Sequence, residues 1–249
     1  MQSLLLRLKR AETPFFKHAR RVCHYCFRAT IPVPSMLKPA GRLFYELRFF
    51  IPILWTRFCS LVYATPLFCC RCESVGKHLQ LQRLPVVSGH TILHIGDDVR
   101  FSGSFAVYSG RFGNRPTLRI GNRVFIGSNV TVTCNQEVVI EDDVLIASNC
   151  RISDYDGHPS SLEKRISKGA PDPEDIRPVR IRKGAWIGCG SHIFKGVTIG
   201  AGSIVGANSV VTHDVPAYCV VAGAPARVVK PPLVSSAASC ATTVSVAVA

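Results

Sequence analysis

Aliphatic residues recur at every sixth position through the C-terminal half of the chain. Residues 181–216 read as six hexads: IRKGAW, IGCGSH, IFKGVT, IGAGSI, VGANSV and VTHDVP. Each hexad opens with isoleucine or valine, at Ile181, Ile187, Ile193, Ile199, Val205 and Val211. A period of six fits neither an α-helix nor a simple strand, and it directs one side chain inward from each flat face of a coil. Because three hexads make one turn, the pattern predicts a parallel β-helix.

Two other hexad positions support this prediction. The fifth position carries small or β-branched side chains, as a tight corner requires: Ala185, Ser191, Val197, Ser203, Ser209 and Val215. Three hexads carry glycine at the second position, Gly188, Gly200 and Gly206, where we expect it to add backbone freedom.

The same phase occurs upstream in three weaker blocks. Their aliphatic or aromatic positions are Ile95, Phe101 and Val107, then Ile120, Ile126 and Val132, then Ile140, Ile146 and Ile152. All blocks together supply about five turns, and each turn buries its row of side chains only against its neighbours. From the repeat alone, the β-helix could be a scaffold without enzymatic activity.

The repeat is interrupted at residues 153–180 by the polar segment SDYDGHPSSLEKRISKGAPDPEDIRPVR. Long loops inside a compact repeat are uncommon unless they have a function. This loop carries Asp154, Asp156 and His158 at alternate positions, followed by Pro159, which restricts the backbone. A histidine held by carboxylates is suited to act as a general base near neutral pH. Alternatively, the two aspartates could be turn formers.

Residues 120–230 resemble the hexapeptide-repeat O-acetyltransferases, close to the maltose, galactoside and exopolysaccharide acetyltransferase group. The resemblance is carried by VLIASNCRISDYDGHP, WIGCGSHIFKGVTIGAGSIVGANSVVTHDVP and VVAGAPARVVK. The upstream segment CESVGKHLQLQRLPVVSGH resembles members involved in cell-surface glycans. The resemblance implies an all-β, left-handed parallel β-helix, a homotrimer, and acetyl-CoA bound in a cleft between subunits. The residue spacing predicts the parallel β-helix but not its left-handedness, the homotrimer or the acetyl-CoA cleft.

The resemblance also assigns catalytic roles. His158 takes the place of the histidine that removes the proton from a sugar hydroxyl while that oxygen attacks the thioester. Asp154 and Asp156 are candidates to orient it. Asn129 matches an asparagine that contacts the acceptor and the acetyl group, although it could instead be a polar corner residue. The backbone N–H of Cys189 would meet the negative charge that develops on the thioester oxygen.

A second set of residues corresponds to the coenzyme A cleft. Trp186 matches an aromatic residue along the pantetheine arm, and Ala207, Thr212 and Arg227 match positions that line the rest of the cleft. Arg227 could bind a phosphate, to which a guanidinium is well matched. His213 stands where relatives often carry lysine, so a phosphate contact there would be weaker or sensitive to pH. Trp186 could instead cover apolar coil surface, and Arg227 could be a solvated cation.

Other functions remain open from the sequence. The γ-class carbonic anhydrases share this solenoid and bind zinc between subunits through three histidines. Here the candidates would be His158, His192 and His213, but their spacing does not match that pattern, and we expect no metal. A non-catalytic scaffold subunit is the other alternative. Within the transferase class, the acceptor could be an amine, because the cleft motifs describe acetyl-CoA much more than the acceptor.

The charge of the chain lies mainly at its N-terminal end. Of a net charge of +14 over 249 residues, residues 1–77 carry +10 and the remainder only +4. Residues 43–70 are also apolar, but only 8 uncharged residues separate Arg48 from Arg57, and 13 separate Arg57 from Arg71. A membrane-spanning helix needs about 20. We therefore expect this region to lie at a membrane surface, attracted by anionic headgroups, or to form a helical cap on the first coil.

The sequence thus predicts three parts. They are a basic amphipathic, membrane-peripheral region at 1–85, an acetyltransferase β-helix at 86–230 with its active-site loop at 153–180, and a flexible tail at 231–249. No convincing secretory signal is present, since MQSLLLRLKR has its charges after a short leucine run, and an organellar transit peptide is the alternative. No nucleic-acid-binding motif accompanies the basic arm.

The 11 cysteines are an odd number without a signal peptide, which favours reduced thiols in the cytoplasm. With the basic, apolar N-terminal region, we expect a cytoplasmic protein at the inner face of the membrane. Structural zinc at Cys23–Cys26 or Cys69–Cys72 is the alternative, although neither cluster has a second cluster at a suitable distance.

Overall fold

The computed structural model describes residues 13–18, 21, 34–110, 115–167 and 169–231. The chain divides into two units, Met1–Pro52 and Ile53–Ala249. The Cys23–Cys26 cluster and residues 232–249, expected to form a flexible tail, lie outside the described residues.

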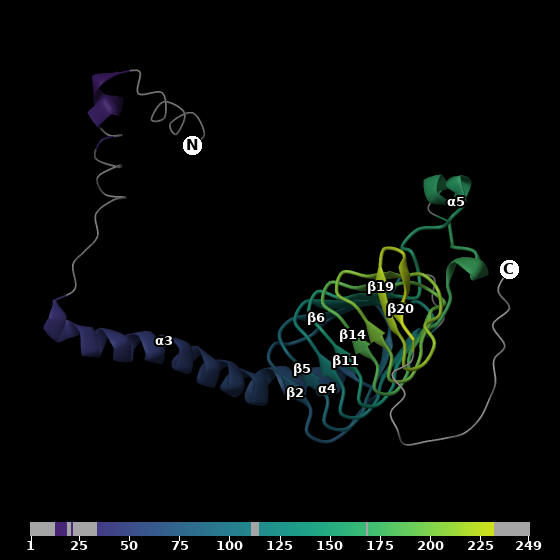
Figure 1. Cartoon of the computed structure of the whole chain (residues 1–249), viewed down its shortest axis with the longest axis horizontal. Helices are drawn as coiled ribbons and strands as arrows, with labels where there is room; N and C mark the ends of the chain where they lie inside the picture. Colours follow the sequence, from purple (N-terminus) through teal and green to yellow (C-terminus); the bar gives the residue numbers. More distant parts are fainter. Residues whose placement is uncertain (1–12, 19–20, 22–33, 111–114, 168, 232–249) are drawn as a thin grey trace. The chain divides into compact units, whose positions relative to one another are not determined.

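Short strands of the second unit stack into the three faces of a left-handed parallel β-helix, which confirms the predicted fold (Figure 1). Within the described residues, the first sheet contains β1 Ser74–Val75, β4 Ile92–Ile95, β7 Thr117–Ile120, β10 Glu137–Ile140, β13 Val179–Ile181 and β16 Thr198–Ile199. The second contains β2 Gln80–Leu81, β5 Arg100–Phe101, β8 Phe125–Ile126, β11 Leu145–Ile146, β14 Trp186–Ile187, β17 Ile204–Val205, β19 Val220–Gly223 and β20 Ala226–Lys230. The third contains β3 Val86–Ser88, β6 Phe105–Tyr108, β9 Val130–Thr133, β12 Arg151–Ser153, β15 His192–Ile193 and β18 Val210–Val211.

The first position of every hexad points into the core. Ile187 on β14 pairs in register with Ile146 on the preceding turn and with Val205 on the next, and all three are fully buried. The other two faces form equivalent columns of aliphatic side chains. This column-by-column burial removes the apolar surface from water and is the main stabilising contribution to the β-helix.

The glycines at the second hexad position have a different role from the one expected. A Cβ on Gly188 would lie 2.6 Å from the Val205 carbonyl oxygen and 2.6 Å from the Ala207 nitrogen, so glycine is needed there because the next coil is so close. The left-handed backbone conformation occurs instead at the fourth position, for example at Gly190 with φ 73° and at Asn208 with φ 55°. The expectation that the second-position glycines add backbone freedom was therefore wrong.

The β-helix begins earlier than the sequence pattern suggested. Strands β1, β2 and β3 form a first coil from Ser74, inside the region expected to precede the repeat. Val75, Leu81 and Val87 have the six-residue spacing and pair with the corresponding positions of the next coil. A single short block among polar residues does not stand out from the sequence.

A continuous helical segment, Ser35–Arg71, precedes the coils. It comprises a 3-10 turn Ser35–Leu37, α3 Lys38–Cys59, a π-helical segment Ser60–Ala64 and α4 Thr65–Arg71. Phe68 on α4 is buried against Phe101 of the second coil, with ring centroids 6.1 Å apart, and Arg71 donates to the Gly89 carbonyl directly after the first coil, so α4 covers the N-terminal end of the β-helix. In contrast, α3 has no buried residue among its 22 residues.

This segment is long and apolar enough, by length and composition, to cross a membrane, and only 17% of its most apolar window is buried. The sequence argument against a spanning helix considered only stretches without any charged residue. An 18-residue stretch that contains Arg57 is still apolar enough, by mean hydropathy, to cross a membrane. The criterion based on uncharged stretches was therefore too strict.

The interruption of the repeat forms a loop between β12 and β13, which carries α5 Leu162–Ser167 and a 3-10 turn Pro173–Asp175. In Figure 1, α5 stands off from the coils. The two ends of the loop are joined where they leave the β-helix. Tyr155 and Ile176 form an antiparallel bridge, and the Arg177 N–H donates to the Asp154 carbonyl at 2.9 Å.

Candidate active site

Asp154 fastens the beginning of the loop to the preceding coil. Its fully buried carboxylate accepts hydrogen bonds from the backbone N–H of Asn135 at 2.8 and 2.9 Å and from that of Gln136 at 2.7 Å. Burial raises the pKa of Asp154 to about 6, and the backbone hydrogen bonds oppose that rise. This carboxylate therefore shapes the turn, as the alternative interpretation proposed.

Asp156 points to a lysine. Its Oδ2 lies 2.6 Å from Nζ of Lys195, which follows β15. In the part of the chain that the structure describes, neither Asp154 nor Asp156 is hydrogen bonded to His158. Neither carboxylate therefore orients the imidazole through a direct hydrogen bond, because each is bound to another partner.

His158 has an exposed side chain and lies between Gly157 and the buried Pro159. One residue beyond the proline, the Ser160 N–H donates to Asp175 at 3.1 Å. The backbone is thus held on both sides of the histidine. An exposed imidazole in this position can accept a proton from a hydroxyl group that approaches from outside the chain.

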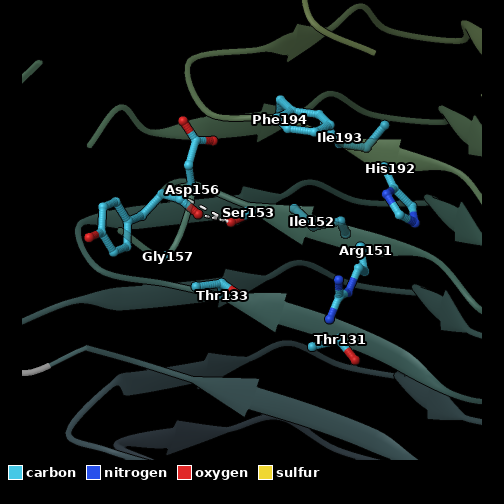
Figure 2. Close-up of a pocket in the computed structure, with 11 residues that line it drawn as sticks. Thr131, Thr133, Arg151, Ile152, Ser153, Asp156, Gly157, His192, Ile193 and Phe194 are labelled. Carbon is cyan, nitrogen blue, oxygen red and sulfur yellow. Dashed lines mark hydrogen bonds between the residues drawn. The ribbon is translucent and has the colours of Figure 1, made fainter. Parts of the chain in front are cut away.

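Beside the loop, a cavity of about 380 Å³ lies on the third sheet. Figure 2 shows Thr131, Arg151 and His192 on successive strands, with Asp156 and Gly157 at the loop side. Strand pairing places Thr131, Arg151 and His192 in one outward row. The complete lining is Thr131, Thr133, Arg151, Ile152, Ser153, Tyr155, Asp156, Gly157, His192, Ile193 and Phe194.

The sequence analysis did not identify Thr131, Arg151 and His192 as one surface that lines a cavity. The available signal was positional: each of its members immediately precedes a buried residue of the inward column, Val132, Ile152 or Ile193. Such alternation predicts which side chains share a face, but it does not show that loop residues such as Asp156 would line a cavity with them.

Asn129 and Cys189 lie near one corner of the β-helix, two coils apart, with Asn149 between them. The Asn129 Nδ2 donates to Asn149 Oδ1 at 2.9 Å, and the Asn149 Nδ2 lies 3.9 Å from the Cys189 Sγ. Asn129 has a φ of 58° and Asn149 a φ of 62°. This conformation, which asparagine tolerates well, gives Asn129 a structural role at the corner and identifies Asn149 as a neighbour that the sequence did not single out.

The residues matched to the coenzyme A cleft lie on other surfaces. Trp186 on β14 is 49% exposed, directly before the buried Ile187, and Ala207 is exposed at the corner after β17. His213 and Arg227 line a second cavity of about 310 Å³, and the Thr212 Oγ1 lies 2.9 Å from the His213 Nδ1. Neither of the two cavities is lined by His158.

The three histidines considered as zinc ligands are in separate places. His158 is on the loop, His192 lines the cavity on the third sheet, and His213 lines the cavity beside Arg227. Among the described residues, no group of three histidine, cysteine, aspartate or glutamate side chains is placed to hold a metal ion.

Two family models match the coils. Residues 178–213 match the bacterial transferase hexapeptide model (six repeats), and residues 117–153 match the hexapeptide repeat of succinyl-transferase. The chain belongs to the hexapeptide-repeat acetyltransferase family.

Two curated relatives agree with this assignment. The chain is 31% identical over 160 residues to the probable acetyltransferase Rv3034c of Mycobacterium tuberculosis, covering 63% of this chain and 49% of the relative. It is 37% identical over 119 residues to the galactoside O-acetyltransferase of Escherichia coli, covering 48% and 56% respectively. The chain thus spans about half the length of these relatives.

The fold is shared with AntD, an N-acyltransferase from Bacillus cereus, solved with dTDP and coenzyme A. The TM-score is 0.54 at 22% identity, covering 68% of this chain and 88% of AntD.

Proposed function

We propose that this protein transfers an acetyl group from acetyl-CoA to a hydroxyl of a sugar or cell-surface glycan intermediate, with His158 as the general base. The observation that carries this proposal is the placement of an exposed histidine on a fastened loop, directly after Gly157, which lines the cavity on the third sheet. Membership of the acetyltransferase family supports the reaction class.

The proposed reaction is a direct transfer. His158 accepts the proton from the sugar hydroxyl as its oxygen forms a bond to the thioester carbonyl carbon. The backbone N–H of Cys189 donates to the oxygen on which negative charge develops. When the carbon–sulfur bond breaks, the protonated imidazole returns its proton to the departing thiolate, so that His158 ends neutral.

Acetyl-CoA fits the remaining predicted residues. Trp186 offers an exposed apolar surface for the pantetheine arm, followed along the coils by Cys189 and Ala207. Arg227 and His213 share a cavity and would meet phosphate oxygens, with Thr212 beside them. Asp214 also lines that cavity, and its carboxylate would weaken a phosphate contact there.

A homotrimer is part of the proposal. Within one chain, the loop histidine and the residues proposed for coenzyme A line different surfaces. In a closed symmetric assembly, the loop of one subunit can complete the site of its neighbour. Such an arrangement accounts for a loop that stands off from its own coils (Figure 1).

The cavity on the third sheet suits a sugar acceptor. The hydroxyl groups of Thr131, Thr133 and Ser153, together with Arg151 and His192, line it and can hydrogen bond to a polyhydroxylated ring. An amine acceptor remains the alternative within the same reaction class.

The test measures coenzyme A release from acetyl-CoA with sugars, nucleotide-linked sugars, lipid-linked sugars and amines, using wild type and His158→Ala. Release that depends on a hydroxyl acceptor and is lost in the variant supports the proposal. Release with amines alone would indicate an N-acetyltransferase. No release, together with no binding of acetyl-CoA, would favour a scaffold, whereas stoichiometric zinc with CO₂ hydration would favour the metalloenzyme.

We also propose that the protein is cytoplasmic and that its N-terminal region contacts the inner face of a membrane. On α3, large apolar side chains including Phe49, Trp55 and Phe58 are exposed. Lys38, Arg42 and Glu46 follow one another at intervals of four, which places them on one stripe of the helix. This stripe holds two basic residues and one acidic residue, and basic side chains beside aromatic and aliphatic ones are typical of a helix in the interfacial plane.

Arg57 favours a surface position over a spanning one. It lies in the middle of the most apolar stretch, where a charge at the bilayer centre costs about 3 kcal/mol or more. In a surface helix, its guanidinium would reach the anionic headgroups instead.

Flotation with vesicles of phosphatidylcholine and phosphatidylserine tests this contact. We expect wild type to float, and Trp55→Ser with Phe58→Ser to bind at least about 100-fold more weakly, because two aromatic side chains that would insert into the bilayer are lost, at about 1.5 kcal/mol or more each. Tyr218→Ser, which removes an exposed aromatic from the coils, is the matched control. A protein that stays in solution contradicts the proposal, and one that resists alkaline carbonate extraction would span the bilayer instead.

A further inference from the structure

Lys195 lies where the two ends of the loop meet the coils. Its Nζ is 2.6 Å from the Asp156 Oδ2, before His158, and 3.6 Å from the Asp175 Oδ1, near the end of the loop. The side chain is only 14% exposed, although it follows an edge of the β-helix. A shielded ammonium group between two carboxylates is held more strongly than a solvent-exposed ion pair.

Asp175 extends this connection to the far side of the histidine. Its carboxylate accepts hydrogen bonds from the Ser160 N–H at 3.1 Å, from the Ser160 hydroxyl and from the Asp172 N–H at 3.3 Å. The hydrogen bonds from Ser160, more than the charge of Lys195, lower the pKa of Asp175 to about 2. The carboxylate is therefore ionised at any pH at which the protein would work.

The two connections converge on one side chain. Asp156 is bound to Lys195 directly, and Ser160 is bound to it through Asp175. Only residues 157–159 lie between these two points, and His158 is their centre. Gly157 has a φ of 93° with open space around its Cβ position, so packing at this glycine does not hold the histidine.

We propose that Lys195 is the positioning residue of the active-site loop, which holds His158 beside the cavity through Asp156 on one side and Asp175 with Ser160 on the other. This inference rests on the proposed function of His158. Lys195 acts through the loop backbone and does not touch the reacting atoms.

The chain contains a matched control at the same hexad position. Lys183 is the third residue of IRKGAW, as Lys195 is the third residue of IFKGVT. Lys183 also pairs with a carboxylate, its Nζ lying 3.8 Å from the Asp143 Oδ2, but its side chain is 66% exposed. Among the described residues, no ion pair or hydrogen bond joins it to the loop. It therefore has the same side-chain chemistry and hexad position, at another corner of the β-helix, without the connection to His158.

The experiment compares Lys195→Met, Lys195→Arg and Lys183→Met for kcat, KM for acetyl-CoA and the thermal unfolding midpoint. We expect Lys195→Met to lower kcat about 10- to 100-fold, because small displacements of a catalytic group have effects of this size. Its KM for acetyl-CoA and its unfolding midpoint should stay close to wild type. Lys195→Arg should recover most of kcat, since the positive charge is restored, and Lys183→Met should resemble wild type. Unchanged kcat in Lys195→Met would overturn the proposal. A loss of kcat that is fully explained by the fraction of the variant that is unfolded would overturn it as well.

A second measurement separates this inference from the proposed reaction. Amide hydrogen exchange of residues 154–160 should become faster in Lys195→Met and stay unchanged in Lys183→Met, whether or not an acceptor has been found. If exchange is faster in Lys195→Met but wild type shows no acetyl transfer, the proposed reaction is refuted and the anchoring role of Lys195 stands. Exchange that does not change would refute the anchoring role itself.

Discussion

The coils and the loop that interrupts them are held in place by different interactions. In the coils, Ile126, Ile146 and Ile187 form one fully buried column, and each contact is repeated by the next turn. In the loop, Leu162 and Ile166 are exposed, and the fixed points are the backbone bridge at its ends and carboxylates bound to backbone amides or to Lys195. The difference implies that folding free energy resides mainly in the coils, whereas activity depends on a few polar contacts of the loop.

The largest expected effect on stability is a core substitution in the coils. Ile187→Ala should lower the free energy of unfolding by about 2–5 kcal/mol, because it leaves a cavity in a column that neighbouring turns hold rigid. Chemical denaturation checks this value. The matched control is Trp186→Ala, the exposed neighbour on the same strand, which should change stability by no more than about 0.5 kcal/mol. Equal losses of stability at Ile187 and Trp186 would contradict the claim that only Ile187 belongs to a buried column of the core.

Asp154 joins the loop to the coils, and its ionisation makes the stability of the folded protein dependent on pH. Because burial raises its pKa to about 6, above the ordinary value of 3.8, the folded state favours the protonated form. Its contribution to stability is therefore fully present below about pH 4 and is lost as the pH rises through about 6. The difference in unfolding free energy between wild type and Asp154→Asn should fall over this interval by about 1–3 kcal/mol.

The measurement is a series of denaturant titrations of both proteins between pH 4 and pH 7. Carboxylates with lowered pKa values, including Asp142 and Asp143, change stability in the opposite direction, but they are common to both proteins and cancel in the difference. A difference that is constant or that increases with pH would show that the buried carboxyl is ionised throughout.

The smallest expected effect is at an exposed ion pair of the coils. Arg123 lies 2.6 Å from Asp143, but their side chains are 54% and 37% exposed. Solvent-exposed pairs contribute little, so Arg123→Ala should leave the unfolding midpoint and the rate of coenzyme A release unchanged within experimental error. A clear loss of either quantity would show that ion pairs of the coils matter as much as the shielded pair at Lys195.

The periodic part of the fold was predictable because one rule acts on every coil. Ile181, Ile187 and Ile193 occupy the expected inward positions, and the interruption between β12 and β13 agrees with the expected loop. The first coil was missed because Val75 and Val87 are only partly buried in a short polar stretch, where six-residue spacing over one turn is not distinctive.

The arrangement of the site could be predicted only in part. The loop and His158 stand out from the sequence, but the partners of Asp154 and Asp156 depend on which coil the loop folds against. Lys195 is 39 positions beyond Asp156, and its counterpart Lys183 has the same hexad position, so sequence alone gives no reason to prefer one of them. The exposed apolar surface of α3 was visible in the sequence, whereas the cap formed by Phe68 was one of two alternatives.

The most direct test of the separation between coils and loop is a paired measurement on one preparation of His158→Ala. Its acceptor-dependent coenzyme A release and its unfolding midpoint are compared with those of wild type. We predict that the rate falls by about 10²- to 10⁴-fold, since a general base is removed, while the midpoint stays unchanged because the side chain is exposed. A variant that keeps its activity, or that loses activity only together with its folded structure, would contradict the account.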